Sequence, residues 1–332
     1  MLISFIIPAY KVEDYLEKCL LSILHQPVDA SLIEVVVTND GSPDSCQSIV
    51  EGLQQKYTNL KLINQENQGV SMARNHAIAA AAGQYIIPID ADDALIADSL
   101  TGVVQFLQAC QPDIAYLPFE VYNAQGKCTW KSDFTALANQ DFDGIDGYYA
   151  CRGLSMIDPD RSWAIAYKRT LINAHQIGYP KDVPILEDGE FVAKCFSVAQ
   201  KIQFYTGTFY RRTMRDNSAI NSTTRYNDKA MRGFLLAARD LRQFESTLSP
   251  VSGKQAHFFN HITAKYILTP FLIAFTTKKW SRVRFVQQLM RNTEFEKLPS
   301  EGVRGTYTNY VRYYNLSIFV LWFFFLFRRF KK

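Results

Sequence analysis

The chain has 332 residues, enough for two domains of ordinary size and a sizeable buried core. Hydrophobic residues make up 48% of the chain and charged residues 20%, a composition that excludes a disordered or fibrous protein. The net charge of +4 combines two opposite parts: residues 1–199 hold 13 Lys and Arg against 25 Asp and Glu, and residues 200–332 hold 23 against 7. We therefore expect the basic part to meet an anionic partner.

Short apolar runs alternate with amphipathic stretches over the first 110 residues. Apolar runs predict strands at Ile3–Pro8, Glu34–Thr38, Leu60–Asn64 and Tyr85–Ile89. Helical spacing of apolar residues, or a high alanine content, predicts helices at Val12–Leu24, Ser45–Lys56, Gly69–Ala82 and from about Asp98 onward. This alternation is typical of an α/β fold with an open, mostly parallel sheet flanked by helices.

Polar and turn-forming residues directly follow three of the predicted strands. The three segments are Pro8-Ala9-Tyr10, Asn39-Asp40-Gly41 and Asp90-Ala91-Asp92. In open α/β sheets, ligands bind beyond the carboxyl ends of the strands. We therefore expect these segments to converge on one ligand site.

Asp90 and Asp92 stand two residues apart after a strand, so an extended backbone projects both carboxylates to the same side. Two hard oxygen ligands suit Mg²⁺ or Mn²⁺, which keep water and substrate phosphates as their other ligands. The alternative is a solvated acidic turn before the next helix, with Asp98 and Ser99 as capping residues. The position of the pair, level with two other polar strand ends, favours the metal site.

Asp40 and Arg74 are further candidates for ligand contacts. The Asp40 carboxylate can accept a hydrogen bond from a base or a ribose, and Gly41 lets the backbone approach a ligand. The alternative is a simple turn in which Asp44 caps the next helix. Arg74 lies on a predicted helix, where its guanidinium can pair with a diphosphate; the alternative is a surface arginine.

The sequence Glu187-Asp188-Gly189-Glu190 precedes an apolar stretch with helical spacing. One of its carboxylates can act as a general base that takes a proton from a hydroxyl nucleophile. Spacing alone favours a simpler interpretation, an acidic first turn stabilised by the helix dipole.

The rest of the chain divides into an irregular and a helical segment. Residues 112–160 lack a clean period, and we expect sheet-edge strands and loops there. After Arg211 the pattern predicts helices at Lys229–Phe244, Lys254–Phe275, Ser281–Met290 and Arg304–Phe327. We therefore expect an α/β domain at residues 1–215 and a helical region at residues 216–332.

The run Tyr313–Phe327 contains no charged residue and is followed by Arg328, Arg329, Lys331 and Lys332. As a helix its 15 residues would cover about 22 Å, short of the ~30 Å hydrocarbon core of a bilayer. This composition predicts docking on an anionic membrane surface. A buried helix or a dimer contact is the alternative.

The six cysteines show neither C-x-x-C spacing nor the spacing of a zinc site with histidines. The first apolar run lacks a preceding basic segment and is cut by Pro8, so it predicts a strand rather than a signal peptide. We therefore expect free thiols and a cytoplasmic protein.

Four ordered motifs together resemble the family 2 glycosyltransferases. They are Ser4–Tyr10 (SFIIPAY), Val35–Asp44 (VVVTNDGSPD), Asn67–Asn75 (NQGVSMARN) and Gly83–Asp93 (GQYIIPIDADD). The resemblance covers residues 1 to about 110 closely and residues 162–196 more loosely. It implies a GT-A fold and an inverting, nucleotide-sugar-dependent enzyme.

The resemblance also implies roles for single residues at the donor site. Pro8, Ala9 and Tyr10 would line the nucleotide pocket, and Asp40 would bind the uracil or ribose. Arg74 would reach the base or a phosphate. The D-x-D of Asp90 and Asp92 would hold Mn²⁺ or Mg²⁺ on the diphosphate, supported by Asp93.

At the acceptor site the resemblance implies that Asp188 is the catalytic base, with Glu187 and Trp163 bordering the acceptor. Asn39 departs from the family, which often has a second Asp at this position. There is no Gln-x-x-Arg-Trp motif of the processive synthases, which favours an enzyme that adds one sugar per encounter.

These features lead to one function and one alternative. The function is metal-dependent transfer of a sugar from a UDP-sugar to a lipid-linked glycan acceptor during cell-surface polysaccharide synthesis, at the cytoplasmic face of the cell membrane. The alternative is an inactive relative that binds nucleotide or glycan as an assembly scaffold. An oxidoreductase is disfavoured because no G-x-G-x-x-G follows the first strand. Nucleic-acid binding is disfavoured because the basic residues are interleaved with long apolar runs.

Overall fold

The computed structural model describes residues 1–154, 160–183, 185–214, 227–276 and 280–330. By its contacts the chain divides into two units. The first unit comprises residues 1–181 and 198–218, and the second comprises residues 182–197 and 219–332. The domain boundary predicted between residues 215 and 216 lies outside the described residues.

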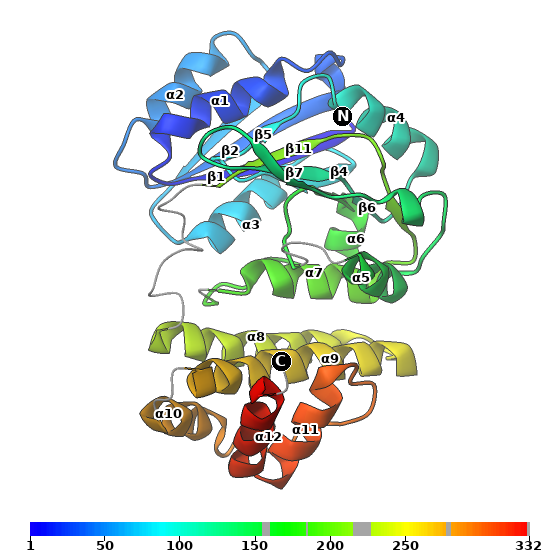
Figure 1. Ribbon diagram of the computed structural model, residues 1–332. Helices are drawn as coiled ribbons and strands as arrows, with labels where there is room; N and C mark the ends of the chain where they lie inside the picture. Colours follow the sequence, from blue (N-terminus) through cyan, green and yellow to red (C-terminus); the bar gives the residue numbers. More distant parts are fainter. Residues whose placement is uncertain (155–159, 184, 215–226, 277–279, 331–332) are drawn as a thin grey trace. The chain divides into compact units, whose positions relative to one another are not determined.

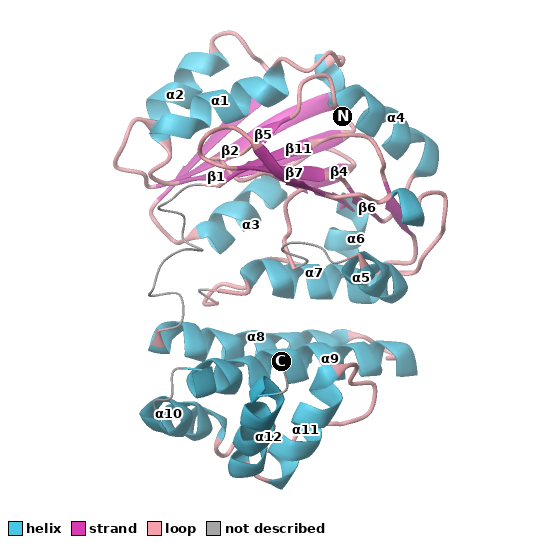
Figure 2. Ribbon diagram, viewed as in Figure 1, coloured by secondary structure: helices cyan, strands magenta, loops and turns pink. Residues whose placement is uncertain are grey.

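A seven-stranded sheet forms the centre of the first unit (Figure 2). Its strands in spatial order are β10 (Ile202–Phe204), β6 (Ile114–Tyr116), β9 (Ile165–Lys168), β4 (Tyr85–Pro88), β1 (Ile3–Ala9), β2 (Ile33–Asp40) and β3 (Leu60–Gln65). Strand β9 runs antiparallel to β4 and β6, and the other neighbouring pairs are parallel. The four strands predicted from the apolar runs are confirmed as β1 to β4.

Helices cover both faces of this sheet, with α1, α2 and α4 on one face and α3 and α6 on the other (Figure 1). Their bounds are α1 (Glu13–Leu24), α2 (Cys46–Gln54), α3 (Val70–Ala80), α4 (Leu100–Cys110) and α6 (Arg169–Ala174). The four helices predicted in the first 110 residues are thus confirmed. The α/β fold class predicted from the alternation is confirmed as well.

A second sheet of four strands lies in the same unit. Its order is β5 (Ala94–Leu95), β11 (Tyr210–Thr213), β7 (Phe119–Tyr122) and β8 (Cys128–Lys131). Strand β11 pairs antiparallel with β5, which begins directly after Asp93. This pairing brings Tyr210 to the acidic residues at the end of β4, although they are 117 to 120 residues apart in the sequence.

The prediction of edge strands and loops for residues 112–160 is wrong in two places. Strand β6 lies inside the seven-stranded sheet, between β10 and β9, and all three of its residues are buried. The segment also contains helix α5 (Gly144–Gly153), whose N-cap Asp143 accepts a hydrogen bond from the Asp146 amide. A three-residue strand and a helix with three glycines carry too little periodicity to be recognised.

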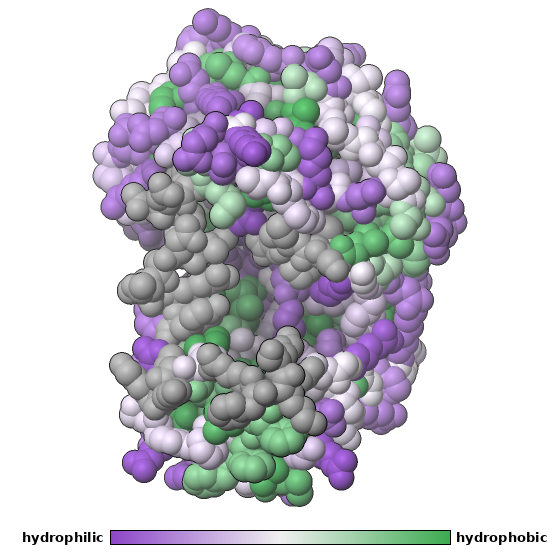
Figure 3. Space-filling view, viewed as in Figure 1, coloured by the Kyte–Doolittle hydropathy of each residue, from purple (hydrophilic) through white to green (hydrophobic). Residues whose placement is uncertain are grey.

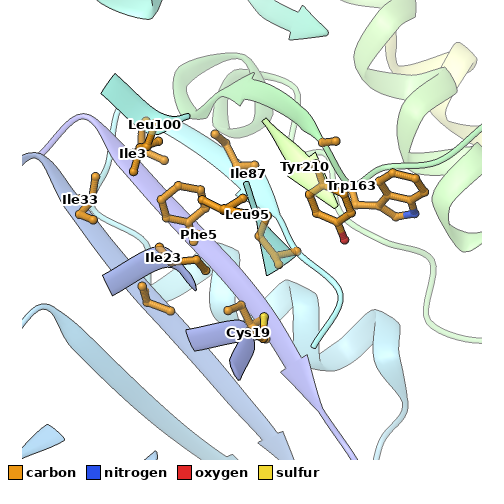
Figure 4. Packing of buried hydrophobic residues seen from close by; sticks show 14 of the residues in the cluster. Ile3, Phe5, Cys19, Ile23, Ile33, Ile87, Leu95, Leu100, Trp163 and Tyr210 are labelled. Atoms are coloured by element: carbon orange, nitrogen blue, oxygen red, sulfur yellow. The ribbon is translucent and has the colours of Figure 1, made fainter. Parts of the chain in front are cut away.

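Apolar residues from β1, β2, β4, α1 and α4 interlock on one side of the sheet. Figure 4 shows Phe5 among Ile3, Ile87 and Leu95, with Cys19 and Ile23 of α1 nearby. All six cysteines of the chain are free thiols, as expected.

The second unit is helical. It contains α7 (Glu187–Val198), α8 (Asp228–Thr247), α9 (Gly253–Thr276), α10 (Trp280–Met290), α11 (Thr306–Leu316) and α12 (Ile318–Phe330). The first three helices predicted after Arg211 are confirmed as α8, α9 and α10. Among the described residues, no helix is both long enough and apolar enough to cross a membrane.

The single helix predicted at Arg304–Phe327 is wrong, because Ser317 divides it into α11 and α12. The backbone of Ser317 is extended, with φ −172° and ψ 159°. Its hydroxyl accepts a hydrogen bond from the Val320 amide at 3.2 Å. Ser317 therefore caps the N-terminus of α12.

Candidate active site

The carboxyl ends of β4, β1 and β2 lie side by side at one edge of the sheet. Ala9 at the end of β1 pairs in register with Asn39 of β2. Beyond the strand ends, the Lys11 amide donates a hydrogen bond to Oγ of Ser42 at 2.7 Å. The three polar segments that follow these strands therefore share one edge of the sheet, as the sequence predicts.

Asp40 is buried, and its carboxylate fixes the entry to helix α3. Its Oδ1 accepts hydrogen bonds from the Gln68 amide and from Nε2 of Gln65, both at 2.7 Å. Its Oδ2 accepts from the Gly69 amide at 2.9 Å. The Asp40 carboxylate thus satisfies two backbone donors before α3, a structural role that the sequence did not reveal.

Asn39 and Gly41 hold the turn on either side of Asp40. The Asn39 side chain donates to Oδ1 of Asn64 and accepts from the Ser42 amide, so it joins β3 to the turn. Gly41 has φ +63°, and a Cβ atom there would lie 2.8 Å from the Asn67 amide nitrogen. Only glycine allows the two loops to approach this closely.

The three residues expected to line a nucleotide pocket differ in exposure. Ala9 is fully buried and Pro8 is half-buried, whereas the Tyr10 side chain is 43% exposed. The ammonium group of Lys11 lies 5.3 Å from the centre of the Tyr10 ring. The Tyr10 side chain is therefore exposed at the end of β1, with a cation close to its ring.

Arg74 pairs directly with the first aspartate of the D-x-D. Its guanidinium is buried and donates to Oδ1 of Asp90 at 2.9 Å. It also lies over the ring of Tyr179, 5.0 Å from the centroid. Tyr179 is held by two hydrogen bonds of 2.8 Å between its backbone and the Asn75 side chain. The structure thus joins two of the residues singled out in the sequence.

Asp90, Asp92 and Asp93 form an acidic cluster beyond β4. Each offers one carboxylate oxygen, and these oxygens lie within 4.8 Å of one another. Burial, followed by the negative charge of Asp90, raises the pKa of Asp93 to about 7. A divalent cation would relieve this repulsion, and an all-oxygen donor set suits Mg²⁺ or Mn²⁺. The three residues therefore fit a hard divalent ion, and Asp90 and Asp92 remain its predicted ligands.

Asp93 is positioned by β11. Its Oδ2 accepts a hydrogen bond from the Tyr210 hydroxyl at 2.7 Å, and its Oδ1 accepts from the Thr213 amide at 2.8 Å. The same hydroxyl accepts from the Asp90 amide at 3.3 Å. Tyr210 was not recognised from the sequence, because only the pairing of β11 with β5 places it here.

Trp163 is buried next to this cluster. Its ring stacks on Tyr210, with centroids 4.9 Å apart and an interplanar angle of 18° (Figure 4). The Phe119 ring meets it edge-on, and the Arg212 guanidinium lies 5.2 Å from its centroid. These contacts show a packing role for Trp163, and its place at an acceptor site stays a prediction.

Glu187 and Asp188 form the first turn of α7, in the second unit, and both are half-buried. One turn further, Glu190 is fully buried and pairs with Lys194 at 2.7 Å; Lys194 also contacts Asp240 of α8. This triad anchors the helix that carries Asp188 within the second unit. Asp188 remains the predicted catalytic base.

Residues 4–164 match the sequence model of the Glycosyl transferase family 2. This part of the chain belongs to glycosyltransferase family 2. The resemblance based on four motifs is confirmed.

Relatives of this chain include the putative glycosyltransferase EpsH of Bacillus subtilis (strain 168). EpsH is 28% identical over 229 residues, which are 68% of this chain and 64% of EpsH. The poly(ribitol-phosphate) beta-N-acetylglucosaminyltransferase TarS of Staphylococcus aureus (strain MW2) is 26% identical over 225 residues, 67% of this chain and 37% of TarS. The chain therefore spans less than two thirds of the length of these curated relatives.

Solved structures show the same fold. Residues 1–349 of S. aureus TarS in complex with UDP-GlcNAc superpose with a TM-score of 0.75 and 20% identity, over 100% of this chain and 93% of that chain. The mannosyltransferase PcManGT from Pyrobaculum calidifontis, solved with GDP-Man and Mn²⁺, gives a TM-score of 0.50 and 15% identity, over 98% of this chain and 86% of that chain. The predicted GT-A fold with a following helical region is confirmed.

Proposed function

We propose that this family 2 glycosyltransferase moves a single sugar from a UDP-sugar to a hydroxyl of a cell-surface glycan, with inversion at the anomeric carbon. One observation carries the proposal. The carboxylates of Asp90 and Asp92 and the buried Arg74 guanidinium meet at the edge of the sheet where open α/β folds bind ligands. This arrangement suits a metal–diphosphate group.

The donor half of the proposal assigns the nucleotide to the ends of β1 and β2. Tyr10 would pack on the base, with Pro8 and Ala9 forming the floor of its pocket. The Oδ2 atom of Asp40 accepts a hydrogen bond from the Gly69 amide, and a carboxylate oxygen can accept a second one, here from uracil or ribose. The TarS structure supports UDP as the nucleotide, because TarS shares this fold and binds UDP-GlcNAc.

Asp90 and Asp92 would hold Mn²⁺ or Mg²⁺, and PcManGT with its Mn²⁺ supports this for the fold. The ion, when bound, would offset the charge that develops on the departing diphosphate. Arg74 keeps Asp90 in place through its hydrogen bond. Tyr210 and Thr213 hold Asp93 beneath the pair.

In the transfer step the acceptor hydroxyl oxygen attacks the anomeric carbon in line with the leaving group. The new glycosidic C–O bond forms as the bond from the anomeric carbon to the diphosphate oxygen breaks, and UDP departs with that electron pair. Asp188 would take the hydroxyl proton as general base, and Glu187 and Trp163 would border the acceptor. Anchoring of α7 by Glu190 and Lys194 supports a fixed carboxylate for this role.

The acceptor is proposed to be lipid-linked and to be met at the cytoplasmic face of the cell membrane, with the protein bound peripherally. Two features support this. The basic second part of the chain suits an anionic surface. In addition, TarS, by its name, acts on a polyanionic polymer, poly(ribitol phosphate).

The test is a transfer assay with the full chain, a panel of UDP-sugars, Mn²⁺ and lipid-linked glycan acceptors, read as UDP release and glycan product. Asp188→Asn should lower turnover by about 100-fold or more, because it removes the base. Binding of UDP with Mn²⁺ should be unchanged in that variant.

Full transfer activity in Asp188→Asn would remove this residue from the base role. Tight binding of UDP with Mn²⁺, without transfer or hydrolysis of any UDP-sugar, would support the inactive scaffold instead.

A further inference from the structure

Helix α12 is apolar from Ile318 to Phe327, and it buries one face more fully than the other. Leu321 is fully buried. The Phe324 ring lies 4.4 Å from that of Tyr313 in α11, and the Phe325 ring lies 5.6 Å from that of Phe275 in α9. A helix that is hydrophobic on all sides normally has a partner on all sides.

The opposite face of α12 is exposed. Phe319, Phe323 and Phe327 stand four residues apart and are 66%, 68% and 53% exposed. Val320 extends the same face, and the exposed Leu316 at the end of α11 lines one cavity together with Phe319. Figure 3 shows hydrophobic residues gathered on the surface where α11 and α12 lie. We call these five residues the α12 stripe; a contiguous apolar patch of this kind marks an interaction surface.

Cations dominate the part of the sequence that carries the stripe. Residues 276–332 contain twelve Lys and Arg, three Glu and no Asp. Among the described residues, the exposed cations include Arg284, Arg291, Lys297, Arg304 and Arg312. An apolar stripe in a basic part of the chain is typical of helices that lie at a membrane interface.

A cavity of about 610 Å³ opens beside the stripe and shares Leu316 and Phe319 with it. Its walls also include Arg291 and Lys297, together with Glu294 and Glu296. The Glu296 carboxylate accepts a hydrogen bond from the Asn292 amide at 2.6 Å, so it is engaged within its own loop. The lining thus places two cations next to the stripe, beside two carboxylates, and Arg291 and Lys297 can pair with phosphate groups at a membrane surface.

The charge of this region indicates whether the α12 stripe binds a membrane or a second copy of the chain. Two copies joined through the stripe would bring together two regions that each carry a large positive excess. Such like-charge contact disfavours association, whereas an anionic bilayer complements the same region. The positive excess of this region therefore favours an anionic lipid surface as the partner of the stripe.

We infer that the α12 stripe docks this chain on an anionic bilayer, with the phenylalanines at the acyl boundary and the surrounding cations at the phosphates. The inference rests on the proposed function, because it names the surface by which the enzyme would meet a lipid-linked acceptor. It is an interfacial mode of binding that requires no spanning helix.

The test is sedimentation of the full chain with vesicles of phosphatidylglycerol and phosphatidylcholine, or of phosphatidylcholine alone. The native protein should bind the anionic vesicles, and binding should weaken as salt rises. Replacing Phe319, Phe323 and Phe327 by Ser should lower the partition coefficient by at least about tenfold, because apolar area is lost from the contact. Phe323→Ser alone should lower it more than Leu236→Ser, a control at an exposed apolar position on α8.

Unchanged vesicle binding by the triple variant would overturn the inference. A native dimer that the triple variant converts to monomer, without change in vesicle binding, would assign the stripe to self-association instead. UDP release from a UDP-sugar without vesicles should be equal in the native and triple-variant proteins. That assay reports on the proposed function independently of docking.

Discussion

The hydroxyl of Tyr210 donates a hydrogen bond to Oδ2 of Asp93 at 2.7 Å. Burial and the neighbouring carboxylates raise the pKa of Tyr210 well above its usual value, so the hydroxyl remains a donor. The same oxygen accepts from the Asp90 amide at 3.3 Å. One side chain from β11 therefore fixes the segment that presents both aspartates of the D-x-D.

Tyr210→Phe should weaken metal use without removing a metal ligand. The variant loses a hydrogen bond to a buried carboxylate, which should lower the free energy of unfolding by about 1–3 kcal/mol. The concentration of Mn²⁺ for half-maximal UDP release should rise about threefold or more, because the segment is less rigidly held. Tyr205→Phe, which removes a half-buried hydroxyl outside the cluster, is the control. An unchanged Mn²⁺ requirement would contradict a positioning role for Tyr210.

Arg74→Met should destabilise the first unit. The substitution keeps much of the side-chain volume but leaves Asp90 without its buried partner, which is 2.9 Å away. The expected loss is about 1–3 kcal/mol, below that of a fully buried pair because Asp90 is partly exposed. Urea unfolding measures this loss as a lower midpoint, and Arg304→Met at an exposed position should leave the midpoint nearly unchanged. Equal midpoints for the two variants would contradict the account.

Glu190 predicts a pH-dependent stability. Burial, followed by its hydrogen bond with Asp240, raises the pKa of Glu190 from 4.5 to about 9, although Lys194 opposes the shift. Between these values the native protein retains a proton that the unfolded chain has released. The contribution of Glu190 to the free energy of unfolding is therefore fully present below pH 4.5 and is lost as the pH rises toward 9.

Glu190→Gln mimics the protonated acid, so the variant should lose this part of the pH dependence of the free energy of unfolding. The free energy of unfolding of the native protein minus that of the variant should decrease by about 1–3 kcal/mol between pH 5 and pH 9. Urea unfolding at pH 5, 7 and 9 measures the difference, which cancels groups common to both proteins. A difference that stays constant, or that grows with pH, would show that Glu190 is ionised in the folded protein.

Gly41→Ala should be more damaging than Gly69→Ala. Both glycines have positive φ, +63° and +87°, so alanine is strained at each. A Cβ at Gly41 would in addition lie 2.8 Å from the Asn67 amide nitrogen, whereas nothing lies within 4 Å of a Cβ at Gly69. Thermal unfolding should show a larger loss for Gly41→Ala, by about 1 kcal/mol or more. A larger loss of stability in Gly69→Ala than in Gly41→Ala would contradict the close backbone approach at Gly41.

The first half of the fold is readable in the sequence because its signals are local. Strands β1, β2 and β4 contain continuous apolar runs, β3 begins with alternating apolar and polar residues, and the turn at Asn39-Asp40-Gly41 marks the end of β2. Strand β6 was misplaced because three residues carry no period. The break at Ser317 was missed because the apolar residues continue through it without interruption.

The site was predictable only in part, for a related reason. Asp90 and Asp92 follow a strand end, Arg74 lies in the second turn of α3, and all three belong to short motifs that indicate their chemistry. Tyr210 reaches the cluster through strand pairing across 117 residues, which no local pattern reveals. Trp163 was assigned to an acceptor site by resemblance, and its stacking on Tyr210 could not be foreseen from spacing.

The most direct measurement is calorimetric titration of UDP-GlcNAc into the full chain, with Mn²⁺ and after removal of metal with EDTA. The account predicts binding at least about tenfold tighter with Mn²⁺, a gain of 1.4 kcal/mol or more. This gain should disappear in Asp92→Asn, while the folded state is retained. Equal affinity in EDTA and in Mn²⁺, or a full metal effect in Asp92→Asn, would contradict the assignment of Asp90 and Asp92 as the metal–diphosphate site.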